Sequence, residues 1–296
     1  MQKSEIEWLG ENGYTWNPTR GCTEISPGCE NCYARVFAER FRGVEGHPYE
    51  QGFDLRLAPG KLVEPLQAQK PGMVFVNSMS DIFHRSVPNQ YIRDIATVMM
   101  EANWHTYQVL TKRAGRMSRF MQTDPDMQAS RKAEHIWWGV SVENKKHGVP
   151  RIQKLREAGT AMPWISFEPL KEDLGDDLDL TGMKWGVVGG ESAWANRRPV
   201  TLEEAWVLRI REKCAALKIP FFFKQWGGNP KNKSRRDLQG RTYDEWPAHE
   251  RVPVKPRSER LDTVRRLTEE FRSRWGNDLI DPLTLVQGDV PKQPTA

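Results

Sequence analysis

The sequence predicts an α/β protein folded as a full or partial (β/α) TIM-like barrel, with about six to seven parallel strands and a basic C-terminal extension. Between residues 73 and 225, short apolar runs alternate with longer helical stretches, as in repeated βα units. The runs are almost entirely apolar, which indicates strands that are covered on both faces. An open doubly wound sheet is the alternative architecture.

The expected elements follow in chain order. A short first strand at residues 14–16 precedes a cysteine-rich loop. Six apolar, β-branched or aromatic runs then predict strands at residues 73–76, 107–110, 136–140, 163–167, 185–188 and 220–223. Helical patterns occupy about residues 91–103, 148–158 and 201–217. The last pattern opens with a capping box, which predicts Thr201 as its N-cap and places Glu204 at the third helical position.

Polar residues follow the predicted strands and predict one lined pocket mouth, because barrel enzymes place their chemistry at the carboxyl ends of strands. The acidic residues suit ribose hydroxyls, polarisation of a substrate or structural ion pairs. The cations suit a carboxylate or phosphate, or are simply solvated. The candidates are Ser78, Asp81, Lys112, Arg113, Glu143, Glu168, Glu191, Lys224 and Gln225.

Composition excludes some classes of protein. A mean hydropathy of −0.70 argues against a membrane protein, and no run approaches the ~18 to 20 apolar residues that span a bilayer. The first residues contain no apolar secretory segment, so we expect a cytoplasmic protein with no membrane partner. The net charge of +5 permits phosphate binding without requiring it.

The cysteines give a sharper signal. Three of the four lie in one loop rich in Gly and Pro, at Cys22, Cys29 and Cys32. In a reducing compartment such a cluster indicates a metal site before a disulfide. Cys214 stands alone in a helical pattern, and we expect it to be a small buried hydrophobe.

The number of cysteines in this loop bears on whether the metal is zinc or iron, because there are three thiols and no fourth ligand nearby in the sequence. A structural zinc site usually has four protein ligands, and the nearest histidine in sequence, His47, is fifteen residues away from Cys32. Three thiolates can instead hold three corners of a [4Fe–4S] cluster and leave one iron open. Zinc with a distant fourth ligand and free structural thiols stay as alternatives.

Several segments together resemble a known family. Besides the cysteine loop itself, they are Thr15-Trp-Asn-Pro18, Leu110-Thr-Lys-Arg113, Ser166-Phe-Glu-Pro-Leu170, Gly189-Gly-Glu-Ser192 and Phe223-Lys-Gln-Trp-Gly-Gly228. In these the chain is similar to the phage-associated three-Cys-motif proteins, a divergent branch of the radical S-adenosylmethionine (SAM) superfamily. The similar segments cover most of residues 14–246.

The resemblance implies specific roles. Cys22, Cys29 and Cys32 would ligate the cluster, and its open iron would chelate SAM. Tyr33 would cover the cluster or stack on adenine, or be a core aromatic. Reductive cleavage of SAM would give a 5′-deoxyadenosyl radical that abstracts hydrogen from a substrate. The resemblance also implies an electron donor, a phage or mobile-element setting and a dedicated partner protein.

Two departures from the family pattern are visible. The common superfamily spacing is C-x3-C-x2-C, whereas the first gap here is six residues, so Cys22 reaches the cluster from a longer loop. Many relatives carry Gly-Gly-Glu after the second strand, where this chain has Asn77-Ser-Met-Ser-Asp81. Ser78 and Asp81 therefore become the positional candidates for holding the SAM amino group.

Residue 228 is the expected boundary between a barrel at 1–228 and a C-terminal segment at 229–296. The segment contains a basic loop, an amphipathic helix near 258–275 and a tail expected to be mobile. Its cations at 231–236, together with Arg241 and Trp246, suit a nucleic acid or nucleotide, or form only a solvated loop. The flexible Gly227-Gly228 pair would let the segment close over the pocket, or is a simple exit turn.

Two functions are consistent with these features. One is a radical-SAM-like iron–sulfur enzyme, which would act on a nucleic acid or nucleotide. The other is a nucleic-acid-binding phage protein in which an iron–sulfur cluster or zinc ion is structural and no radical chemistry occurs.

Overall fold

The computed structural model describes residues 1–193, 198–228 and 236–285. Its centre is an eight-stranded sheet in which seven strands run parallel and pair in chain order, with a short antiparallel strand at one edge. The strands in sheet order are β1 (Gln2–Lys3), β2 (Gly13–Trp16), β5 (Met73–Val76), β6 (Thr106–Thr111), β7 (Ile136–Ser141), β8 (Met162–Phe167), β9 (Trp185–Gly189) and β10 (Phe221–Gln225).

Consecutive pairing in chain order is the arrangement of a βα barrel. In the described part of the chain the two edge strands, β1 and β10, do not pair, so the curved sheet forms a partial barrel. The predicted fold class is therefore confirmed, and all seven predicted strands are present. The sequence did not predict β1, nor the separate two-stranded sheet of β3 (Thr19–Arg20) and β4 (Arg56–Leu57).

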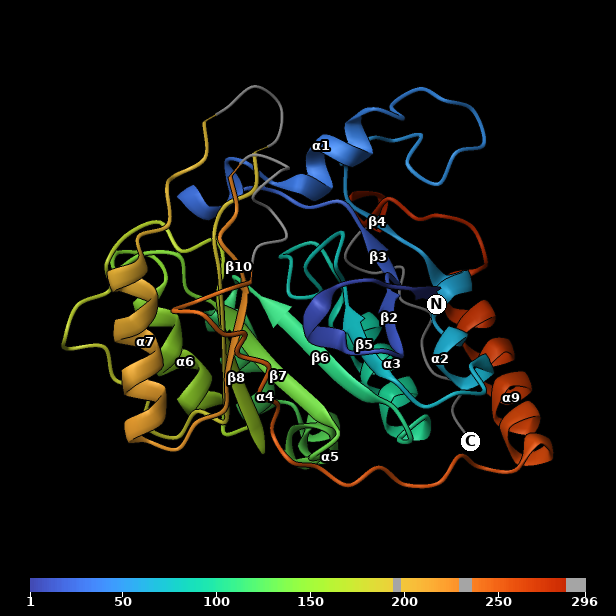
Figure 1. Cartoon of the computed structure of the whole chain (residues 1–296). Coiled ribbons are helices and arrows are strands. Elements are labelled where there is room, and N and C mark those ends of the chain that lie inside the picture. Colours follow the sequence, from blue (N-terminus) through green and yellow to red (C-terminus); the bar gives the residue numbers. More distant parts are fainter. Residues whose placement is uncertain (194–197, 229–235, 286–296) are drawn as a thin grey trace.

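Helices cover the outer face of the sheet, except the helix at Tyr33–Glu39, which lies near the carboxyl ends of the strands (Figure 1). The helices are α1 (Tyr33–Glu39), α2 (Glu64–Gln67), α3 (Asn89–Glu101), α4 (Ala114–Thr123), α5 (Gln128–Lys132), α6 (Val149–Ala158), α7 (Glu204–Ala216) and α9 (Arg257–Trp275). None of them is both long and apolar enough to cross a bilayer, within the residues described. Helices α3, α6, α7 and α9 lie where the sequence predicts them.

The predicted capping box of α7 is wrong. The helix begins at Glu204, its N-cap is Glu203 in an extended conformation, and no side chain caps it. Leu202 explains the difference, because its side chain is buried in the main core. The chain stays extended up to Glu203 and places Leu202 against the barrel, so the helix starts later than the local pattern predicts. Cys214 of α7 is fully buried, as expected.

Aromatic side chains fill the inner face of the sheet. Trp137, Trp164, Trp185 and Phe222 come from four neighbouring strands and form a cluster separate from the core under the helices. Trp8, from a short 3-10 helix at Glu7–Leu9, fills the space between them, with ring centroids 5.2 Å from Trp164 and 5.8 Å from Trp185. Both faces of the strands are thus covered, as their apolar sequences predict.

The described part of the C-terminal segment packs against the barrel. Asp244 bridges to Phe222 of β10, and the Trp246 indole donates to the Trp8 carbonyl at 2.9 Å. Beyond Trp246 the chain runs along the lower edge of the barrel in the view of Figure 1 to α9, which packs against α2. The division of the chain at residue 228 stays a prediction. Residues 229–235 of the predicted basic loop and residues 286–296 of the predicted tail lie outside the described residues.

The buried His105 predicts a loss of stability in acid. Its Nδ1 accepts from the Gly72 N–H at 3.2 Å and its Nε2 lies 3.1 Å from the Pro65 carbonyl, which suits the neutral ring. Burial lowers the pKa of His105 to about 4. Since the unfolded chain then binds a proton that the folded chain does not, this contribution is complete above pH 6.5 and is lost as the pH falls to about 4.

We expect this loss to amount to about 3 kcal/mol, at about 1.4 kcal/mol per pKa unit. Urea unfolding between pH 7 and pH 4 measures it. The His105→Gln variant keeps a donor and an acceptor but no titrating group, so its stability should depend less steeply on pH. An equal dependence in both proteins would contradict this assignment.

Candidate active site

A cavity of about 510 Å³ opens at the carboxyl ends of the parallel strands. This volume lies in the range of about 300–1,000 Å³ that is usual for small-molecule sites. Residues that end or follow β5 to β10 line it, together with the cysteine loop. From the strand ends these are Asn77, Ser78, Ser80, Asp81, Thr111, Lys112, Arg113, Ser141, Ser166, Glu168, Gly190, Glu191, Ser192, Lys224 and Gln225.

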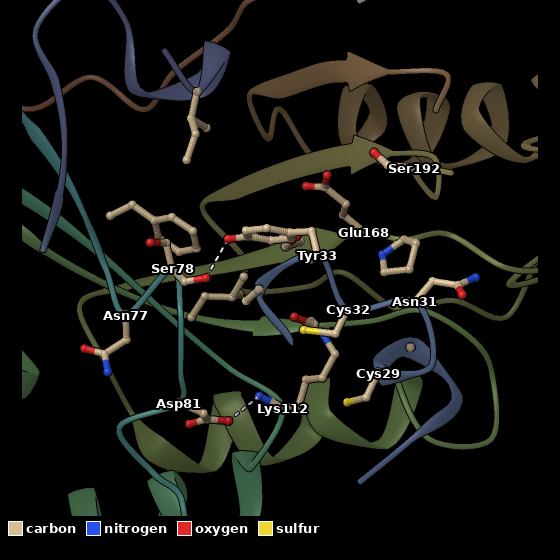
Figure 2. Close-up of a pocket in the computed structure, with 18 of the residues that line it drawn as sticks. Cys29, Asn31, Cys32, Tyr33, Asn77, Ser78, Asp81, Lys112, Glu168 and Ser192 are labelled. Atoms are coloured by element: carbon tan, nitrogen blue, oxygen red, sulfur yellow. Dashed lines mark hydrogen bonds between the residues drawn. The ribbon is translucent and has the colours of Figure 1, made fainter. Parts of the chain in front are cut away.

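The cysteine loop forms one wall of this cavity. Gly21 begins it with a positive φ of 76°, and a Cβ there would lie 2.3 Å from the Asp54 carbonyl oxygen, so the turn requires glycine. Cys29 ends the 3-10 helix Pro27–Cys29, and Cys32 directly precedes α1. The three thiols are free, partly buried and line the same cavity. Figure 2 shows Cys29 and Cys32 beside Tyr33.

The surroundings of these thiols favour their neutral form when no metal is bound. Burial, with Asp81 as a second cause, raises the pKa of the Cys22 thiol to about 12. Burial also raises the pKa of Cys32. Metal binding here would therefore release protons. Two cations lie close by, since the Arg113 guanidinium donates to the Cys22 sulfur at 3.3 Å and Lys112 is also near the cavity wall.

The donor set is consistent with a cluster held by three cysteines. Three thiols on one cavity wall can supply three corners, and the nearby cations offset the charge of thiolates. Asn31, between Cys29 and Cys32, also lines the cavity, and its buried amide oxygen has no hydrogen-bond partner within the described residues. In that same part of the chain, no group of three or more His, Cys, Asp and Glu side chains is arranged to hold a single metal ion.

Tyr33 connects the cysteine loop to the loop that follows β5. Its hydroxyl donates to the Ser78 carbonyl at 2.5 Å, and 44% of the residue is exposed (Figure 2). The Ser78 hydroxyl is 3.1 Å from the Asn17 amide nitrogen. Tyr33 is thus tethered at its hydroxyl while its ring stays accessible, which suits a stacking role better than a core role.

Asp81 is the best-connected of the predicted residues. Its carboxylate accepts from the Thr111 hydroxyl at 2.8 Å, from the Lys112 backbone N–H at 3.2 Å and from the Arg113 guanidinium at 2.9 Å. These contacts join the loop after β5 to the end of β6. They also occupy the carboxylate, which leaves Asp81 fewer acceptor sites for a ligand.

Glu143 does not belong to the cavity lining. Its side chain is fully buried, 3.1 Å from the Lys112 ammonium and 2.6 Å from the Arg151 guanidinium. Burial alone would raise the pKa of Glu143, but the two cations outweigh it and hold the pKa below its ordinary value. Glu143 therefore acts on the site through Lys112. The cysteine loop packs directly on it, because a Cβ on Gly28 would lie 2.5 Å from the Glu143 side chain, so this position requires glycine.

The remaining predicted residues form pairs at the other end of the cavity. Glu168 contacts the Lys224 ammonium at 2.5 Å, and Glu191 contacts Lys171 at 2.9 Å. The Gln225 amide donates to the Ser192 hydroxyl at 3.2 Å. All but Glu143 of the predicted site residues line one cavity, although they come from segments spread over more than half of the chain.

The amino-terminal segment of the cavity lining was not predicted from the sequence. Glu5, Ile6, Glu7 and Trp8 face the same cavity as the cysteines. The signal was the apolar pair Trp8-Leu9 within an otherwise polar start of the chain, which predicts local burial. It carried no information on where these residues would be buried.

The fold and the site define a class of protein: an α/β partial barrel with a cysteine-walled cavity at the carboxyl ends of its strands. The chain belongs to the family described as "Protein of unknown function (DUF5131)", whose model matches residues 3–251. No curated protein matches the chain.

Three solved structures are similar in fold. Spore photoproduct lyase complexed with dinucleoside spore photoproduct is 11% identical with a TM-score of 0.39, over 88% of this chain and 73% of that one. A variant of that lyase is 12% identical with a TM-score of 0.42, over 92% and 76%. Another variant, with bound AdoMet and dinucleoside spore photoproduct, is 11% identical with a TM-score of 0.37, over 86% and 72%.

The buried charges around Glu143 generate a stability prediction. Glu143→Gln leaves the Lys112 and Arg151 cations without their buried anion, so we expect a loss of about 3–5 kcal/mol in the free energy of unfolding. Urea unfolding of the metal-free protein measures it. Glu157→Gln is the matched control, because Glu157 contacts Lys154 on the surface, and its unfolding curve should be unchanged. Similar curves for both variants would contradict the assignment.

Proposed function

We propose that this protein is an iron–sulfur enzyme of the radical SAM type. The observation that carries the proposal is that Cys22, Cys29 and Cys32 line one cavity at the carboxyl ends of the strands of a partial βα barrel. The three cysteines would hold a [4Fe–4S] cluster, with its open iron available to SAM. When bound, the cluster supplies the electron that cleaves SAM to a 5′-deoxyadenosyl radical.

The residues of the chain have distinct tasks in this proposal. The cysteines bind, and Lys112 and Arg113 offset the negative charge of their thiolates. Ile6, Trp8, Phe75 and Leu110 form an apolar part of the cavity that excludes water. Such exclusion matters because a radical must meet its substrate rather than solvent, and the protein contributes positioning and burial to the chemistry of its cofactor.

SAM and a substrate would share the remaining lining. Tyr33 offers an accessible ring for adenine. Ser78, which accepts from the Tyr33 hydroxyl, and Asp81, further along the same loop, are the candidates for the SAM amino group. Glu168, Glu191, Lys224 and Gln225 occupy the end beyond β8 to β10 and offer hydrogen-bonding groups for ribose or for substrate. Their ion pairs would have to open or share their partners when a ligand binds.

We further propose a nucleotide or nucleic acid as substrate. The support is the combination of an accessible aromatic ring with cations in one cavity, which suits a base and a phosphate. Trp246 does not line this cavity, and its indole N–H donates to the carbonyl of Trp8, which does. An electron donor follows from the chemistry, whereas the phage setting, the partner protein and the cytoplasmic location stay predictions.

Cluster assembly and SAM cleavage test the proposal. After anaerobic reconstitution with iron and sulfide, the wild-type protein should be brown and, with SAM and dithionite, should release 5′-deoxyadenosine. Cys22→Ala, Cys29→Ala and Cys32→Ala should each lose bound iron and SAM cleavage, because each removes one of three ligands. Metal and sulfide analysis and chromatography of the products are the measurements.

Cys214→Ala is the matched control and should keep both properties, since Cys214 is buried in α7 away from the cavity lining. A fully loaded cluster that never cleaves SAM would favour the binding protein with a structural cluster. Colourless protein with one zinc ion per chain would rule out the proposed cofactor.

A further inference from the structure

Arg113 makes an unusual set of contacts at the cysteine wall. It lies directly after β6, and its side chain is 11% exposed. One terminal nitrogen is 3.3 Å from the Cys22 sulfur and 2.9 Å from Asp81. The other donates to the carbonyl of Thr23 at 2.9 Å and to its hydroxyl at 3.2 Å. One guanidinium thus holds a cysteine sulfur and the residue after it.

Hydrogen bonds to neighbouring residues fix the orientation of the Arg113 guanidinium. Asp81 accepts from Arg113 and is itself held by the Thr111 hydroxyl and by the backbone N–H groups of Phe83 and Lys112. The Arg113 backbone N–H donates to the Thr111 hydroxyl oxygen at 2.8 Å. A buried cation with a buried anion and a closed hydrogen-bond network has little freedom to turn away, so its contact with Cys22 is built into the fold.

Cys22 differs from the other two cysteines in this respect. Within the described residues, its sulfur alone among the three accepts a hydrogen bond from a side chain. It is also the cysteine separated from the others by the six-residue gap. The ring nitrogen Nε2 of His84 lies 2.8 Å from the Thr23 hydroxyl and adds a further anchor for the same turn. The six-residue gap is therefore held by hydrogen bonds at Cys22 and Thr23, which is where the proposed cluster ligand lies.

We propose that Arg113 is a positioning residue that presents the Cys22 sulfur to the cluster and raises the reduction potential of the cluster through its hydrogen bond. The inference rests on the proposed function and deepens it. It gives Arg113 a role toward the cofactor, whereas its position after β6 suggested a contact with a substrate carboxylate or phosphate.

The direction of the effect follows from charge. Reduction adds one electron to the cluster, and the reductant, dithionite in the experiment below, loses one. The reduced cluster is more negative by one charge, so a cationic donor at a ligand sulfur stabilises it more than the oxidised cluster. Hydrogen bonds to the sulfurs are among the factors that set the potentials of iron–sulfur clusters. Loss of the Arg113 hydrogen bond should therefore make reduction harder.

The experiment is a redox titration of the reconstituted full-length protein, followed by the electron paramagnetic resonance signal of the reduced cluster. Arg113→Met removes both the hydrogen bond and the charge, and Asp81→Asn removes the nearby anion. The double variant restores the local net charge without the donor. We expect its equilibrium constant for one-electron reduction to fall about tenfold, a shift of about 59 mV to lower potential.

Two further variants keep the result interpretable. Arg119→Gln is the matched control, because Arg119 lies in helix α4, which begins directly after Arg113, and does not line the cavity, and its potential should equal that of the wild type. If the methionine variants lose the cluster, Arg113→Lys keeps the charge with a single nitrogen in place of the fork, and should give a smaller shift in the same direction.

The outcomes separate this inference from the proposed function. A wild-type chain that assembles no cluster overturns both. A wild-type cluster whose potential matches that of the double variant, or of Arg113→Lys where that variant is used, overturns only the role of Arg113. An equal shift in Arg119→Gln also overturns it, because the change would then reflect general loss of positive charge.

Discussion

The ion pair between Asp81 and Arg113 connects the parts of the molecule on which the site depends. Asp81 comes from the loop after β5 and Arg113 from the end of β6, and the guanidinium reaches on to Cys22 and Thr23. Three segments far apart in the chain are thereby held at one point. Because the pair is buried, its geometry is costly to break, and the cysteine wall keeps its place relative to the strand ends.

The curvature of the sheet explains why so many polar groups meet there. Seven parallel strands in chain order bring their carboxyl ends to one rim, and the residues after each strand share the space inside it. Trp8 and Phe75 of the aromatic cluster on the inner face line the same cavity. The cavity therefore has charged side chains at the strand ends and apolar side chains at Trp8 and Phe75. The charged part can bind charged groups, and the apolar part can exclude water.

Much of this arrangement could be predicted from local pattern. Apolar runs such as Met73–Val76 and Ile136–Ser141 have the length and composition of buried strands, and the polar residues behind them have a fixed place in a parallel sheet. The two-residue strands β3 and β4 have no periodicity to detect. The prediction of Thr201 as the N-cap of α7 was wrong because the burial of Leu202, a tertiary contact, outweighs the local capping-box motif.

Side-chain partners were the least predictable part of the site. Glu143 looks like its neighbours in sequence, yet it points into the core toward Arg151, ten positions after Ser141 at the end of β7. A residue that follows a strand can be predicted to lie at the rim of the barrel. Whether its side chain points into the cavity or into the core depends on the local backbone conformation, which the sequence pattern does not show. The role of Trp8 was equally hidden, since its aromatic partners Phe75, Trp164 and Trp185 all lie far from it in the sequence.

The placement of Trp8 has a consequence for how the molecule is made. Its carbonyl accepts a hydrogen bond from Trp246, 238 positions later, and its ring packs on Trp164 and Trp185 as well as on the earlier Phe75. Contacts of such separation form slowly, because the intervening chain must be ordered first. The three thiols of the cysteine loop are therefore synthesised long before the later part of this aromatic cluster, and during that interval they are accessible to metal ions and to oxidants.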